Sequence, residues 1–241
     1  MIDMLKSEDL KYKRTFAKKI FYIAPIYILI QIVALNRYVF SNSMNWWSVF
    51  FMPFTIAILC TLISIAEKKA GKYRTLKSKD INLKKMWISK ILVISYYTFL
   101  ASLMVILYLL TIKLVHHSSL VQVGPLFLGT FVMWITTLIL IPICLFLSEA
   151  FGPFSSIFVT CIGIAGGALT VTGPNWYLCP WSLNMRLMCP ILKLNPNGEL
   201  LESTSNLLDY SVIPVGLIVG IVGFIGLSLL TSLWFSKKEA R

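Results

Sequence analysis

Long apolar runs separated by short polar segments make up most of this chain. Each run is close to the roughly 20 residues that a helix needs to cross about 30 Å of hydrocarbon. The pattern predicts six transmembrane helices, at about 16–35, 46–66, 87–112, 125–147, 154–171 and 207–235. Because the connections are short, the sequence predicts an all-α integral membrane protein whose residues 1–241 form a single transmembrane domain.

The connection between the fifth and sixth predicted helices, residues 173–206, has an unusual composition. Its residues 174–198 are too polar and too often interrupted by proline to span a bilayer, yet they are dense in Trp, Tyr, Met and Leu. Aromatic rings with one polar atom are typical of the headgroup region of a membrane. We therefore expect an external segment that either lies on the membrane surface or is re-entrant.

Within this segment, residues 180–190 predict a short helix of about three turns that ends at its second proline. At helical spacing, side chains of two kinds fall on separate faces, namely Trp181, Met185 and Met188 on one and Ser182 and Arg186 on the other. A tight turn is predicted at 195–198, where the sequence is NPNG. One hypothesis makes the segment a lid that contacts a substrate through Trp176, Trp181, Met185 and Met188, with Arg186 at the headgroups. The other makes it a connector between two membrane helices.

Composition and charge agree with a membrane protein. The chain is 57% hydrophobic and 13% charged, whereas soluble domains carry about a quarter charged residues. Its net charge of +12 does not indicate nucleic-acid binding, because the basic residues flank the apolar runs. Of the 22 Lys and Arg residues, 18 fall on one predicted side, so we expect both termini to be cytoplasmic.

Small residues recur on two predicted helices. Gly163 and Gly167 are four residues apart, as are Gly216 and Gly220. This spacing lets helix backbones approach closely. We expect these faces to pack within the chain, with a subunit contact as the alternative.

The sequence offers few candidates for chemistry. His116 and His117 have no Cys, Asp or Glu at ligand spacing, so no metal site is expected. No phosphate-binding loop or hydrolase motif is present, and the middle turns of the predicted spans carry no charge, which disfavours an ion-driven carrier. Cys179 and Cys189 are predicted to be free thiols, because the helix between them would hold them too far apart for a disulfide.

Two acids stand at the ends of predicted helices where an acid is disfavoured by the helix dipole. Glu67 precedes a loop with eight basic residues between positions 67 and 85, and Lys68 and Lys69 offset its charge. Glu149 has no basic residue in its own short loop, 148–153. We expect either the start of the fifth helix or a cation from another protein to stabilise it.

A basic intracellular loop, a very short second one and a long outer segment before the last span resemble the permeases of ABC-2 exporters. The closer resemblance is to permease subunits of lantibiotic-immunity ABC transporters. It rests on three stretches, Pro180-Trp181-Ser182, Arg186-Leu187-Met188-Cys189-Pro190-Ile191-Leu192 and Asn195-Pro196-Asn197-Gly198.

The resemblance implies a nonenzymatic permease subunit in a bacterial plasma membrane. It would work with a second, different permease and two copies of a cytoplasmic ATPase that holds ATP and Mg, with no cofactor in this chain. The complex would expel a lanthionine-containing amphipathic peptide from membrane lipid, giving self-immunity. The coupling residues would be Glu67, Arg74, Lys77 and Glu149. Alternatives are a permease for another amphiphile, such as a drug or lipid, and an intramembrane enzyme.

Overall fold

The computed structural model describes residues 2–13, 16–26, 28, 39–69, 82–115 and 123–240. Within these ranges the chain is helical apart from turns and an isolated β-bridge between Leu194 and Leu200. The α-helices are α1 (Ile2–Lys13), α2 (Ala17–Ile23), α4 (Val39–Trp46), α5 (Met52–Lys69), α7 (Leu83–Val115), α8 (Val123–Thr137), α9 (Leu140–Ala150), α10 (Ser155–Thr170), α11 (Ser182–Leu192) and α12 (Val212–Ala240). A π-helical segment, η2 (Trp47–Phe51), joins α4 to α5, and three 3₁₀ turns are η1 (Ala24–Ile26), η3 (Trp176–Leu178) and η4 (Asn206–Leu208).

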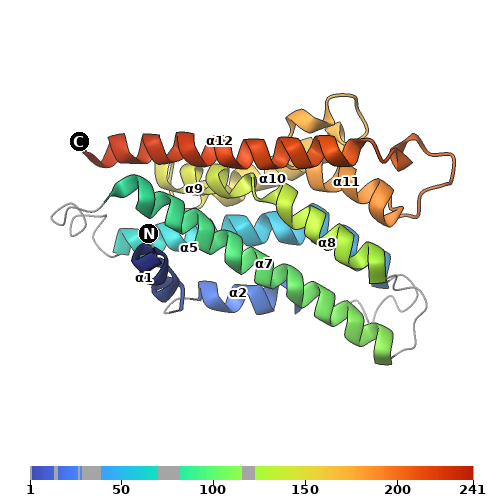
Figure 1. The fold of residues 1–241 in the computed structure, drawn as a ribbon, viewed down its shortest axis with the longest axis horizontal. Helices are drawn as coiled ribbons and strands as arrows, with labels where there is room; N and C mark the ends of the chain where they lie inside the picture. Colours follow the sequence, from blue (N-terminus) through green and yellow to red (C-terminus); the bar gives the residue numbers. More distant parts are fainter. Residues whose placement is uncertain are drawn as a thin grey trace.

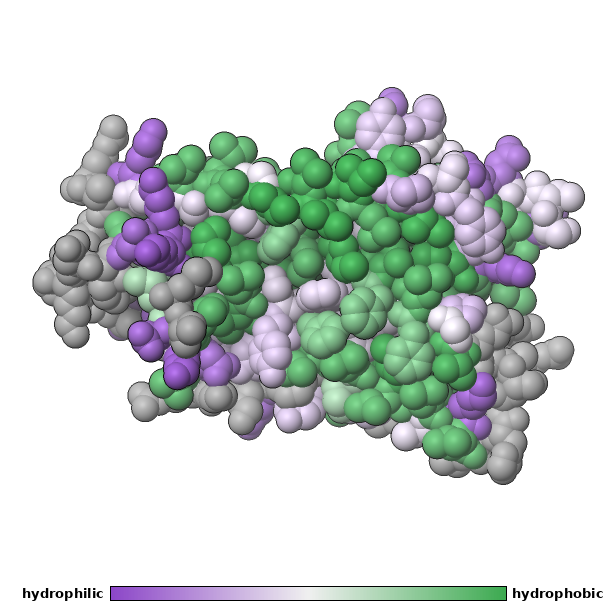
Figure 2. Space-filling view, in the orientation of Figure 1, coloured by the Kyte–Doolittle hydropathy of each residue, from purple (hydrophilic) through white to green (hydrophobic). Residues whose placement is uncertain are grey.

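The long helices run side by side along the long axis of the molecule, and both termini lie toward the same end (Figure 1). Helix α7 contacts α1, α8 and α12, while α5 contacts α9 and α10. A broad apolar band crosses the middle of the face shown in Figure 2, and hydrophilic residues gather toward the two ends. This distribution is the one expected of a helical membrane domain.

Within the described residues, four helical stretches are long and apolar enough to cross a membrane, by length and composition. They are Phe40–Lys69, Leu83–Leu114, Val123–Ala150 and Val212–Lys238. They overlap the predicted spans 46–66, 87–112, 125–147 and 207–235, so a long apolar helix is confirmed at each of these four places. The predicted span 154–171 corresponds to α10, which is apolar but has 16 residues. Of the predicted span 16–35, the described part forms the short helix α2 and the turn η1, and residues 27 and 29–35 lie outside the described residues. Six spans therefore stay a prediction.

Proline explains the break between α8 and α9. Pro142 has no N–H to donate to the carbonyl of Leu138, four residues earlier. That carbonyl accepts instead from the backbone N–H of Ile141, at 3.0 Å. The apolar stretch is therefore divided into two helices that the sequence joins into one predicted span.

The glycine faces pack within the chain, as predicted. A methyl group at Gly163 would lie 2.3 Å from the ring of Trp181, and one at Gly216 would lie 2.4 Å from Leu187. A methyl group at Gly220 would lie 3.1 Å from the Cα of Thr136. Glycine is therefore what allows α10 and α12 to approach the segment around α11 and helix α8.

Two substitutions on α10 test this packing. Gly163→Ala adds a methyl group that clashes with the ring of Trp181. It should lower the free energy of unfolding by about 1–3 kcal/mol, the usual cost of overpacking. Gly166→Ala is the matched control, because nothing lies within 4 Å of its added methyl group and Ala favours helix over Gly by about 1 kcal/mol. Thermal unfolding of the purified chain in detergent measures both. Equal melting temperatures for the two variants would contradict the packing.

Candidate functional site

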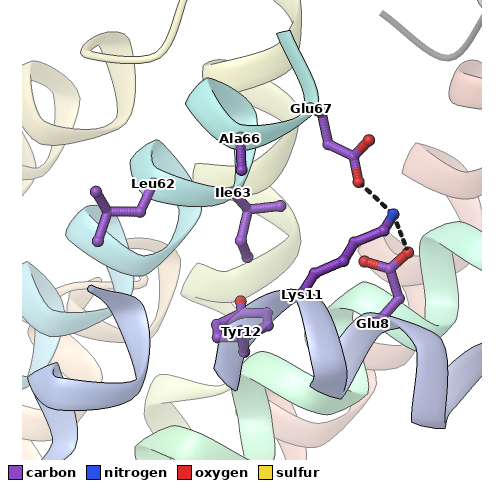
Figure 3. A pocket seen from close by; sticks show the side chains of 7 residues that line it. All are labelled: Glu8, Lys11, Tyr12, Leu62, Ile63, Ala66 and Glu67. Carbon is purple, nitrogen blue, oxygen red and sulfur yellow. Dashed lines mark hydrogen bonds and ion pairs between the residues drawn. The ribbon is translucent and has the colours of Figure 1, made fainter. Parts of the chain in front are cut away.

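A cluster of four charged residues, three of them buried and the fourth, Lys11, with 40% of its side chain exposed, joins three helices near the end of the molecule where the termini lie. Lys90 of α7 is fully buried, and its ammonium donates to Glu8 of α1 at 2.9 Å and to Glu67 of α5. Lys11 of α1 donates to the same two carboxylates, at 2.8 Å each. Figure 3 shows Lys11 lying between Glu8 and Glu67. Two ammoniums and two carboxylates thus share one site.

The cluster balances its own charge. Burial lowers the pKa of Lys11, but the carboxylates of Glu8 and Glu67 outweigh this effect and raise its pKa overall. A cavity of about 20 Å³ beside the cluster has room for about one water molecule. The arrangement can therefore hold helices together, because each buried charge has an opposite partner.

Helix α1 has two further contacts with α7. The hydroxyl of Tyr97 donates to the carboxylate of Asp9 at 2.9 Å. The ring of Tyr97 also stacks on that of Tyr12, with centroids 4.9 Å apart. Together with the charged cluster, these contacts fix α1 against the bundle.

The partners of Glu67 differ from the expected ones. The sequence analysis expected Lys68 and Lys69 to offset its charge, but both are exposed in the structure. Glu67 itself is 4% exposed and faces Lys11 and Lys90. Sequence proximity misleads here, because neighbours on a helix point in different directions. Glu67 is therefore an internal residue, which leaves it little surface for contact with another protein.

Glu149 has a partner in its own chain that the sequence did not indicate, and the expected contacts with a helix start or an external cation stay predictions. The ammonium of Lys238, near the end of α12, lies 3.7 Å from the Glu149 carboxylate and donates to its backbone carbonyl at 2.9 Å. Lys238 also lies 5.0 Å from the centre of the Trp234 ring, within the range of a cation–π contact. The remaining coupling candidates, Arg74 and Lys77, lie outside the described residues, as do His116 and His117.

Helix α11 lies inside the bundle, with every residue from Ser182 to Leu192 buried. It packs against α8, α10 and α12. Met188 accepts a hydrogen bond from the hydroxyl of Ser48 at 3.1 Å. The expected amphipathic helix with a face open to membrane or substrate was therefore wrong.

The other predicted lid residues are also enclosed or partly so. Trp176 is 7% exposed and Met185 is 1% exposed. Trp181 is partly buried against the glycine face of α10. Arg186 is 7% exposed and donates to the carbonyl of Leu207 at 2.8 Å, so it braces the turn η4 instead of reaching headgroups.

Asn184 of α11 finds its partners on a neighbouring helix, α8. Asn184 donates to the hydroxyl of Thr137 at 2.6 Å and accepts from that of Thr136 at 2.5 Å. Sequence reasoning missed these three residues. The signal was present, because an amide in a helix rich in Met and Leu needs a polar partner when it is buried.

Local structure around α11 follows the sequence in part. The helix begins near the predicted start but continues through Pro190 to Leu192, and it ends at Lys193, which has a left-handed φ of 54°. The turn at 195–198 is confirmed, because the N–H of Gly198 donates to Asn195 at 2.8 Å and Asn195 donates to Glu199 at 2.7 Å. Cys179 and Cys189 are free thiols, as predicted.

No family model, curated protein or solved structure matches this chain.

The charged cluster makes a specific prediction. Lys90→Met should lower the free energy of unfolding by about 3–5 kcal/mol, because it leaves Glu8 and Glu67 buried with a single shared cation. Lys69→Met, which removes an exposed charge from the end of α5, should change it by less than about 0.5 kcal/mol. Thermal unfolding in detergent measures both.

A double variant separates the ion pair from the loss of the lysine alone. Adding Glu67→Gln to Lys90→Met should recover part of the lost stability, because it removes one of the two uncompensated carboxylates. Losses that simply add in the double variant would argue against a direct interaction between Glu67 and Lys90.

Proposed function

We propose that this chain is the permease subunit of an ABC exporter that removes a lantibiotic-type antimicrobial peptide from the cell membrane. In this proposal, two copies of a separate ATPase bind and hydrolyse ATP with Mg, and a second, different permease completes the complex. The chain itself carries out no chemistry and lies in a bacterial plasma membrane with both termini in the cytoplasm.

The observation that carries the proposal is the sequence of residues 180–198, in the setting of a helical membrane domain. This stretch bears the resemblance to lantibiotic-immunity permeases. Four helices in the described part of the chain are long and apolar enough to cross a membrane. A domain of this kind has the means to contact an amphipathic substrate within the bilayer, but it needs an external source of free energy.

Burial of α11 changes where the substrate contact is expected. Met185 and Met188 are 1% and 0% exposed. Replacing them would disturb the packing of the bundle, and neither side chain has surface for contact with a substrate. The turn preceding α11 offers accessible apolar surface instead, because Tyr177 is 39% exposed and Leu178 is 71% exposed. We place the first contact with the peptide there, and α11 behind it as the support that holds the turn in position.

The turn between α9 and α10 is the proposed contact with the ATPase in the described part of the chain. Phe151 is 74% exposed and Phe154 is 69% exposed. Glu149, beside them, is held by Lys238. Exposed aromatic side chains on a short, well-braced turn are suited to a pocket on a partner, because aromatic residues dominate the energetics of many protein interfaces.

A pair of substitutions tests this contact. Phe151→Ala with Phe154→Ala should lower the amount of ATPase that co-purifies with the tagged chain by about tenfold, the effect of losing about 1.4 kcal/mol at an interface. Leu169→Ala is the control, because Leu169 is 84% exposed on α10, near the end of that helix away from this turn. Co-expression with the ATPase and second permease, followed by quantification of all three chains, measures both variants.

Cells that co-express these variants with the ATPase and the second permease also test which substrate is exported. The double variant should also lower the dose of lanthionine peptide that they survive, while the Leu169→Ala cells should survive as the parent does. Full ATPase recovery in the double variant would reject this turn as the contact. Protection against a drug or lipid amphiphile without protection against the peptide would favour the alternative substrate class.

A further inference from the structure

An open groove lies between the start of α7 and the last turns of α12. Its volume is about 430 Å³. Two lysines and an isoleucine come from α7, and two leucines and a serine come from α12: Lys84, Lys85, Ile88, Leu229, Ser232 and Leu233. The groove thus brings positive charge and apolar surface together at one end of the bundle.

The charged part of the groove is open to an anion. Lys84 and Lys85 are exposed, and neither forms a salt bridge with a carboxylate within the described ranges. The first turn of α7 holds no acid, so the positive end of the helix adds to the field of the two ammoniums. A ligand that neutralises both lysines would relieve their mutual repulsion.

The apolar part faces the surroundings of the protein. Leu229 is 56% exposed and Leu233 is 42% exposed. They belong to α12, whose most apolar stretch is 22% buried, against 56–61% for the other three long apolar helices. In a bilayer, α12 would therefore meet lipid along much of its length, and an acyl chain would lie along these leucines.

A second groove, on the other side of α12, shows why the first is distinctive. It is bounded by α9 and α12, has a volume of about 390 Å³ and includes Phe146 and Trp234. Its nearby cation, Lys238, already contacts the carboxylate of Glu149 at 3.7 Å. An anion there would meet a negative charge, whereas Lys84 and Lys85 have none beside them in the described structure.

We propose that the groove between α7 and α12 is a binding site for an anionic phospholipid. Its phosphate would be held by Lys84 and Lys85, and an acyl chain would pack on Ile88, Leu229 and Leu233. Clusters of lysines at the end of a membrane helix favour anionic lipid by about 1 kcal/mol for each charge. The inference needs the chain to lie in a bilayer, but it does not depend on which molecule the chain transports.

Native mass spectrometry of the purified full chain in detergent tests the site. Titration with phosphatidylglycerol and with phosphatidylcholine gives the preference for the anionic lipid. Lys84→Gln with Lys85→Gln should reduce this preference by roughly 10-fold to 30-fold. Lys68→Gln with Lys69→Gln is the matched control, because it removes two adjacent exposed lysines at the same end of the bundle but outside the groove, and it should leave the preference within about twofold.

Other outcomes would overturn the proposal. Equal losses in the two double variants would indicate general surface charge, and equal binding of the two lipids by the parent would exclude recognition of the headgroup. Displacement of phosphatidylglycerol by millimolar inorganic phosphate would indicate a site for free phosphate. Unchanged lipid preference with reduced ATPase co-purification in the Lys84 and Lys85 variant would assign these lysines to a protein partner. Circular dichroism and thermal unfolding check that both variants are folded.

Discussion

A charge inside an apolar helical bundle needs an opposite charge within reach, and Lys90 shows how this chain meets that requirement. Its ammonium has no exposed surface and lies between Glu8 and Glu67. Taking an unpaired ion out of water costs several kcal/mol, so the three residues depend on one another. Because they come from α1, α5 and α7, the pairing also fixes where the first helix packs.

Buried polar and charged side chains that need partners also fix the position of α11. Its Asn184 and Arg186 are buried, and each has a partner close by, the amide with Thr136 and Thr137 and the guanidinium with the carbonyl of Leu207. Glycines on α10 and α12 then allow Trp181 and Leu187 to approach closely. A helix of eleven residues is thus enclosed on all sides by its own chain, which supports the exposed turn at Tyr177 and Leu178 from behind.

Hydropathy predicted much of the fold, because membrane helices are specified by long apolar runs. The glycine spacing and the turn at 195–198 were also readable, since both depend on local backbone geometry. Partners distant in sequence were not: Lys238 is 89 residues from Glu149, and no local pattern connects them. The break between α8 and α9 was also missed, because the apolar run in the sequence continues through Pro142 without interruption.

The burial of α11 was hidden for a different reason. An amphipathic pattern shows that one face of a helix prefers polar surroundings, but headgroups and buried threonines satisfy that preference equally well. Trp181 and Met188 are suited to a membrane surface and to a protein core alike. The candidate substrate contact therefore moves from the helix to the turn before it, while the candidate ATPase contact moves from the charge of Glu149 to its aromatic neighbours Phe151 and Phe154.

Cysteine accessibility tests most directly whether α11 is enclosed by its own chain. Cys179 precedes α11 and is partly exposed, whereas Cys189, near the end of α11, is fully buried. The purified chain in detergent would be treated with a maleimide, and peptide mass spectrometry would locate the modified thiols. We predict that Cys179 reacts in the folded chain and that Cys189 reacts only after unfolding. Modification of both thiols at similar rates in the folded chain would contradict the account and return α11 to the membrane surface.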